Sequence, residues 1–322
     1  MSTDSIAASA ALPMRDGTLT ISRLIDLYMA EYAGRDGTRL QRLGWWSAKL
    51  GAVRLDEISD DHLHVALETL TGSAARFYAG KDADGKPIHR SKRKPIAPAT
   101  LNRYAASISA VFTWAIRRRV APKGWDHPGR RIERRPENNE KTRFLSDDER
   151  DRLLSACKAS SWPRLYLLVL MALTTGARKG ELLGLRWADV DLTQLLAHIG
   201  RTKNGDPRAL PLVPAVVEEL QRFKPDNTNN NTGLLFLSAR NPGQAYSFEP
   251  KFHEAMRVAR IKGVTFHTMR HSCASMLAQN GATLLEIADL LGHRQLQMTK
   301  RYSHLATSHK AAMVNRLLGD MR

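Results

Sequence analysis

The stretch TTGARKGELLGLRWADVD, residues 174–191, places an arginine at the start of a short amphipathic helix. Arg178 follows Gly176, and Glu181 lies three residues further on. Side chains three apart share one face of a helix, so the carboxylate can orient the guanidinium group. On its own this arrangement is typical of an ordinary surface ion pair. The rest of the sequence decides whether it belongs to a functional site.

Composition narrows the class of protein. The 322 residues include 43% hydrophobic and 25% charged residues, as in folded proteins of one large or two ordinary domains. The formal net charge of +17 favours a polyanionic partner such as DNA, RNA or an anionic membrane.

The sequence shows no sign of a membrane span, a secretory signal or a metal site. No apolar run approaches the roughly 20 residues of a membrane span. The N-terminus carries acids and does not resemble a secretory signal, so we expect a cytoplasmic protein. Cys157 and Cys273 are predicted to be buried free thiols. Because the eleven histidines show no metal-ligand spacing, we predict no metal and no cofactor.

Residues 18–121 are predicted to form a helical domain. Four amphipathic stretches indicate its helices, beginning near residues 21, 38, 59 and 100. Residues 79–98, which are rich in Gly, Pro and Lys, are predicted to be a loop, with room for a short hairpin at Asp84-Gly85.

Residues 122–143 are predicted to be a basic interdomain linker, because proline, glycine and charge are dense there. Basic side chains in and around it are candidates for contact with a DNA backbone, the alternative being a solvated linker. The candidates are Arg117, Arg118, Arg119, Lys123, Arg130 and Arg131, together with Lys92, Arg93 and Lys94 of the preceding loop.

Residues 144–322 are predicted to form a second domain that begins with a capping box at Ser146 and Glu149. Two short strands are expected at 196–201 and 208–212, with a third in GLLFLS. Thr283 and Glu286 are expected to cap a helix that Gly292 ends. Helices are predicted at about 147–158, 163–174, 213–223, 249–260, 267–279, 284–291 and 306–318. The fold class is therefore mainly α with a small antiparallel sheet in the C-terminal domain.

HTMRHSCASMLA, residues 267–278, supplies a second basic pair. His267 and Arg270 project from one helix face, and His271 lies one turn after His267. The planar guanidinium group of Arg270 and the titratable imidazole of His267 could together bind a phosphate. A purely structural contact between the two side chains fits equally well.

LLGHRQLQMTKRYSHL, residues 290–305, contains the remaining candidates. His293 directly follows the helix-ending Gly292. Tyr302 lies nine residues later, next to Lys300 and Arg301. The tyrosine could cap the core, or it could be a nucleophile for a phosphate.

Taken in order, these residues resemble the tyrosine recombinase (phage integrase) family, whose pattern is Arg, His-x-x-Arg, a further His or Trp, and Tyr. The similarity covers residues from about 145 to 320. The family also carries a catalytic lysine on a β-hairpin between the first arginine and the His-x-x-Arg motif. Lys203 in TKNGDPRALPL fits that place. The helical first half resembles the family's core-binding domain by arrangement more than by motif.

The resemblance implies a catalytic set. Tyr302 would attack a DNA phosphodiester and form a 3′-phosphotyrosyl link. Arg178, Arg270 and His293 would stabilise the phosphate, and Lys203 would protonate the leaving 5′-oxygen. His267 would either help to deprotonate the tyrosine or bind the phosphate, and Glu181 would orient Arg178. Neither a metal nor ATP would be required.

The resemblance also implies partners. The two domains would grip double-stranded DNA as a clamp at inverted-repeat sites. The amphipathic end of the chain would either pack on its own domain or dock on a neighbouring protomer. Docking would give a tetramer on synapsed DNA. An accessory directionality factor and a nucleoid location are also implied. We expect an integrase of a mobile element. The alternatives are a chromosome-dimer-resolving recombinase, a type IB topoisomerase-like enzyme and a non-catalytic DNA-binding protein.

Overall fold

The computed structural model describes residues 17–34, 36–81, 84, 87–137, 143–200, 207–224, 233–241, 243–306, 314–315 and 318–319. The chain divides into two compact units, Met1–Asn138 and Asn139–Arg322. The mainly helical class with small antiparallel sheets is confirmed. Among the described residues, no helix is both long enough and apolar enough to cross a membrane.

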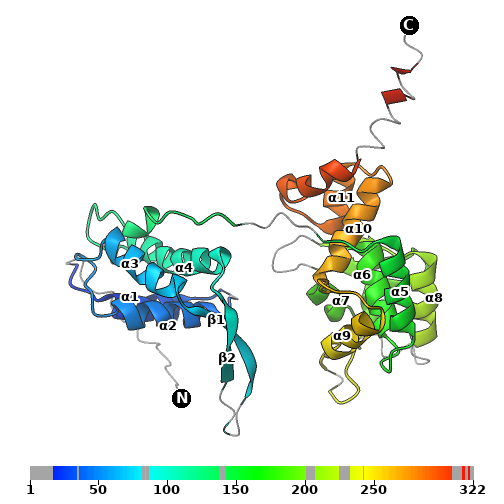
Figure 1. Cartoon of the computed structure of the whole chain (residues 1–322), viewed down its shortest axis with the longest axis horizontal. Coiled ribbons are helices and arrows are strands. Elements are labelled where there is room, and N and C mark those ends of the chain that lie inside the picture. Colours follow the sequence, from blue (N-terminus) through cyan, green and yellow to red (C-terminus); the bar gives the residue numbers. More distant parts are fainter. Residues whose placement is uncertain are drawn as a thin grey trace, which may run out of the picture. The chain divides into compact units, whose positions relative to one another are not determined.

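The first unit is built around helices that begin within two residues of their predicted starts (Figure 1). Ser59 accepts a hydrogen bond from the backbone N–H of His62, which is the capping role expected of it. The apolar helix faces meet around Trp46 and Phe112, both of which are fully buried. The helices are α1 (Ile21–Glu31), α2 (Arg39–Leu50), α3 (Asp60–Thr71) and α4 (Pro98–Arg117).

The stretch 79–98 was predicted to be a loop with room for a short hairpin at Asp84-Gly85. A β-hairpin is present there, but it is longer than expected and replaces most of the predicted loop. Strand β1 (Ala74–Lys81) pairs antiparallel with β2 (Pro87–Pro95), and Phe77 lies opposite Arg90. Figure 1 shows the two strands running out from the helices of their unit. Lysine and arginine occupy four of the nine positions of β2, and they hid the apolar alternation by which a strand is usually recognised.

The segment after α4 packs on the first unit instead of leaving it as an exposed linker. The ring of Trp125 meets Phe112 edge-on, with 5.4 Å between centroids, and His127 is only 3% exposed. The side chain of Asn102 donates to the carbonyl of Arg135 and accepts from its N–H. A short 3-10 helix, η1 (Pro128–Arg130), lies within the segment. The aromatic contacts and the hydrogen bonds to the Asn102 side chain hold the segment against the first unit.

The second unit surrounds α6, whose residues are apolar on every side and almost all buried. The predicted capping boxes at Ser146 and Thr283 are both present, and Gly292 ends its helix in the left-handed conformation, with φ 65°. The α-helices are α5 (Asp147–Lys158), α6 (Leu165–Thr175), α7 (Lys179–Gly184), α8 (Pro214–Phe223), α9 (Glu249–Val258), α10 (His267–Gln279) and α11 (Leu284–Leu291). The 3-10 helices are η2 (Trp187–Asp189), η4 (Leu296–Met298) and η5 (Lys300–Ala306).

A three-stranded antiparallel sheet has the order β3 (Val190–Asp191), β4 (Leu196–Ile199) and β5 (Arg208–Pro211). Both predicted strands are confirmed with slightly shorter bounds. The GLLFLS stretch forms only isolated bridges at Leu234 and Leu237, so the predicted third strand is wrong there. Residues 201–206, between the two predicted strands, and most of the predicted helix 306–318 lie outside the described residues.

Candidate active site

Arg178 is held at the start of α7 by the predicted acid. Its Nη1 donates to Oε1 of Glu181 at 2.8 Å, and its backbone N–H donates to Oε2 at 2.8 Å. Its Nη2 also donates to the carbonyl oxygen of Gly292 at 3.3 Å. The Glu181 side chain is only 6% exposed, so the guanidinium group is fixed by a mostly buried carboxylate.

Arg208, a residue that the sequence did not single out, joins the same carboxylate. Its Nη2 lies 2.8 Å from Oε2 of Glu181, and its Nη1 donates to the carbonyl of Leu291. Burial lowers the pKa of Arg208, and the charge of Glu181 opposes that shift. Arg208 thereby connects β5 to both α7 and the end of α11.

Arg270 is the most deeply buried of the three arginines, at 4% exposed. Its Nη1 donates to the carbonyl of Gly176 at 2.7 Å, while its buried Nη2 has no hydrogen-bond partner among the described residues. Burial, helped by the charges of Arg178 and Arg208, lowers the pKa of Arg270 to about 10. The group remains charged at neutral pH and keeps a donor unused.

Gly176 allows this close packing. Its φ is +62°, and a Cβ there would lie 2.3 Å from Cδ2 of Leu291. The left-handed conformation and the crowding both favour glycine at this position.

His293 lies just after the end of α11, as predicted. Its Nδ1 is 2.7 Å from Oγ1 of Thr299, a fully buried hydroxyl. Burial first, and then the charges of Arg270 and Arg178, lower the pKa of His293 to about 4. The imidazole is therefore neutral at physiological pH. If its Nδ1 accepts from Thr299, the ring keeps an N–H for an anion.

Tyr302 lies on η5 with only 2% of its surface exposed. Its hydroxyl oxygen is 2.6 Å from Nδ1 of His271. Burial raises the pKa of Tyr302, and the charges of Arg301 and Arg270 act against that shift. The hydroxyl is therefore protonated in the free protein.

His271, not His267, is the histidine that contacts Tyr302 in this structure. The two imidazole rings meet edge-on, with 4.7 Å between centroids, and the pKa of His267 is lowered chiefly by burial. The only signal for His271 in the sequence was its position four residues after His267. Arg208 gave no local signal, because its partners lie 27 and 83 residues away.

The structure thus brings five predicted site residues close to one another within the second unit, namely Arg178, Glu181, Arg270, His293 and Tyr302, with His267 alongside. Lys203 lies outside the described residues.

The candidate DNA contacts belong to the first unit. The side chains of Arg117, Arg118, Arg119, Lys123 and Lys94 are exposed, and those of Lys92 and Arg93 lie outside the described residues.

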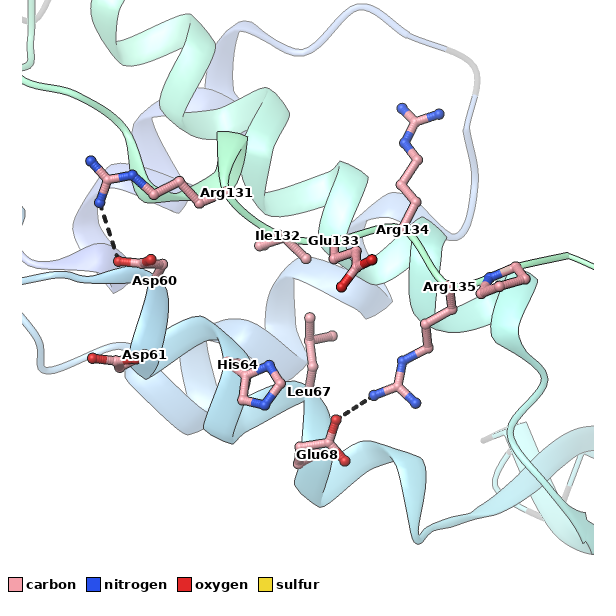
Figure 2. Close-up of a pocket in the computed structure, with 11 residues that line it drawn as sticks. Asp60, Asp61, His64, Leu67, Glu68, Arg131, Ile132, Glu133, Arg134 and Arg135 are labelled. Carbon is pink, nitrogen blue, oxygen red and sulfur yellow. Dashed lines mark hydrogen bonds and ion pairs between the residues drawn. The ribbon is translucent and has the colours of Figure 1, made fainter.

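Arg130 and Arg131 are already engaged with acids of their own unit. Arg131 contacts Asp126 at 2.6 Å and Asp60 at 3.3 Å, and Arg130 lies 3.8 Å from Asp126. Figure 2 shows the segment around Arg131 lying beside α3 across a cavity, with the guanidinium group of Arg131 directed at Asp60.

Comparisons with known proteins identify the family. Residues 143–309 match the phage integrase family. The shufflon-specific DNA recombinase of Escherichia coli is 30% identical over 217 residues, which is 66% of this chain and 52% of that protein. The type 1 fimbriae regulatory protein FimE of Escherichia coli K12 is 32% identical over 176 residues, covering 51% of this chain and 86% of FimE. Some relatives are thus matched over only about half of their length.

A solved structure supports the fold. The Tn1549 transposon integrase, in complex with transposon right end DNA, superposes with a TM-score of 0.68 at 18% identity. The superposition covers 92% of this chain and 99% of the integrase chain. With its arginines, histidines and tyrosine gathered at one place, the chain belongs to the phage integrase family of tyrosine recombinases.

Proposed function

We propose that this chain is a site-specific DNA recombinase that cuts and rejoins strands through a 3′-phosphotyrosyl intermediate, with Tyr302 as nucleophile. The observation that carries the proposal is the buried contact network around Arg178, Arg270 and Tyr302. A phosphodiester under attack gains negative charge on its non-bridging oxygens. Guanidinium groups fixed in advance can stabilise that charge without reorganising.

Each group of the site has a distinct task in this reaction. Arg270 offers the unused Nη2 donor, and Arg178 offers a fork oriented by Glu181. The neutral His293, steadied by Thr299, donates to the same phosphate. Lys203 is the proposed acid for the leaving 5′-oxygen, because that oxygen leaves poorly unless it is protonated. His267, close to Arg270, is assigned to the phosphate.

The DNA partner would be a duplex with inverted-repeat sites, held between the two units as a clamp. The exposed basic residues around the end of α4 would contact phosphates. The similarity to a shufflon-specific DNA recombinase favours action on a mobile or invertible element. Dimer resolution is the alternative within the family. We further propose assembly as a tetramer on synapsed DNA, an accessory directionality factor, and a place at the nucleoid.

The test uses a library of nicked duplexes, in which a departing short strand traps the covalent complex. Wild type and Tyr302→Phe are incubated with the library, and detergent-resistant adducts are sequenced. We expect adducts enriched for an inverted repeat with wild type and none with Tyr302→Phe, although that variant still binds DNA. Adducts without sequence preference would indicate a topoisomerase-like enzyme. Tight binding without any adduct would indicate a non-catalytic DNA-binding protein.

A further inference from the structure

The hydroxyl of Tyr302 makes one contact that the roles above do not use. Its oxygen is 2.6 Å from Nδ1 of His271, a short distance for a hydrogen bond between a hydroxyl and an imidazole. The tyrosine comes from η5 and the histidine from the second turn of α10, and those two elements pack against each other. Since both groups are largely buried, water cannot easily replace either partner.

The surroundings of His271 keep its ring neutral in the free protein. His267 and Arg270 face it from α10, and Arg301 and Tyr302 face it from η5. Burial first, then the neighbouring His267 and the two arginines, lower the pKa of His271 to about 4. A neutral imidazole has a lone pair, and Nδ1 directed at a hydroxyl can accept its proton. A phosphate anion bound to Arg270 would offset the arginine charge, which would raise the proton affinity of His271.

We propose that His271 is a catalytic residue that accepts the proton of the Tyr302 hydroxyl during attack. The inference rests on the proposed function. In this step the tyrosine O–H bond breaks and its proton moves to Nδ1 of His271. The tyrosine oxygen forms a bond to phosphorus, the bond from phosphorus to the 5′-oxygen breaks, and that oxygen takes a proton from a separate acid. During resealing the same proton returns from His271 to the tyrosine.

His267 is the competing acceptor, and the geometry favours His271. The ring of His267 stacks edge-on against His271, and among the described residues the hydroxyl of Tyr302 has its short contact with His271 alone. Burial first, and then the charges of Arg270 and Arg178, lower the pKa of His267, so this ring lies near the two arginines assigned to the phosphate. We therefore assign His267 to the phosphate and His271, in the second turn of α10, to the role of the base.

The decisive variant is His271→Asn, because its amide can occupy the position of Nδ1 and form the hydrogen bond but cannot take up a proton. Adduct formation is timed in a single turnover at saturating nicked duplex, over about pH 5 to 9. We expect the rate to fall by about 10²- to 10⁴-fold. His253→Asn, on the exposed side of α9, is the matched control and should react like wild type.

A second substrate distinguishes loss of the base that deprotonates Tyr302 from loss of the acid that protonates the leaving oxygen. A 5′-bridging sulfur in place of the leaving oxygen departs without protonation, so it rescues loss of the acid but not loss of the base. We expect His271→Asn to stay slow on this substrate. Rescue by sulfur would overturn the inference, as would a rate within about threefold of wild type or above it. A faster variant would mean that His271 merely restrains the tyrosine.

A measurement on protein that retains His271 keeps the test independent of folding in the His271→Asn variant. The imidazole NMR resonance of His271 is titrated in the DNA complex of Tyr302→Phe, and its pKa is compared with the bend in the wild-type pH–rate profile. The two should agree within about one unit. A larger difference would refute His271 as the base. A wild type that forms no adduct at all would instead count against the recombinase function.

Discussion

Replacing Glu181 with alanine should strongly destabilise the second unit. The carboxylate is 6% exposed and binds Arg178 and Arg208, whose side chains are 30% and 13% exposed. Removing it leaves guanidinium groups buried beside Arg270 without their counter-charge. Hydrogen bonds to charged groups contribute about 1.5–3 kcal/mol each, and breaking a buried ion pair costs about 3–5 kcal/mol. Because water can partly replace the acid at Arg178, we expect a loss of about 3–4 kcal/mol in the free energy of unfolding.

Amide hydrogen exchange of α6 and α10 measures the opening free energy of this unit separately from the first unit. The matched control is Glu219→Ala on α8, which removes a carboxylate paired with Arg222, a side chain that is 67% exposed. The Glu219 side chain is itself only 15% exposed, but because its arginine partner is well solvated the pair contributes about 0–1 kcal/mol. If Glu181→Ala lowers the opening free energy no more than Glu219→Ala does, the buried carboxylate does not hold the arginines as argued.

Two further predictions concern backbone packing and pH. Gly176→Ala should lower the free energy of unfolding by about 2–5 kcal/mol, because it combines left-handed backbone strain with overpacking against Leu291. Thermal unfolding measures this loss. The control is Gly180→Ala, where an added Cβ meets nothing within 4 Å, and it should be neutral or stabilising. Stability should also fall as pH drops from about 6.5 to about 4, because unfolded histidines take up protons in that window while His271 and His293, with pKa values of about 4, do not. Urea unfolding across this range should show a shallower pH dependence in His293→Asn, and an unchanged slope would contradict the assignment.

Sequence reasoning succeeded where the signal was local. Ser146 with Glu149, and Thr283 with Glu286, are three residues apart, so each capping box could be recognised from spacing alone. The left-handed end of α11 followed from Gly292 in the same way. The main site residues were found because the order of their motifs resembles one family.

It failed where long-range contacts decide the outcome. A hairpin was expected only around Asp84-Gly85. The full length of β1 and β2 was missed because basic residues interrupt the apolar pattern of β2 and only the pairing with β1 defines it. Arg208 became visible only when the fold brought the end of α11 and Glu181 to it. The segment with Trp125 looked like an exposed linker because its proline and charge outweighed the two aromatic rings that bury it.

The acids beside Arg131 change what a salt titration of DNA binding would count. Duplex DNA holds a condensed layer of counterions, and each protein cation that replaces them steepens the salt dependence of the affinity. If Arg131 breaks its ion pairs with Asp60 and Asp126 to bind a phosphate, it exchanges one anionic partner for another. The two carboxylates that it leaves then bind cations from solution. The measured slope would then be smaller than the number of phosphates touched. A modest slope in this protein is therefore compatible with an extensive DNA interface.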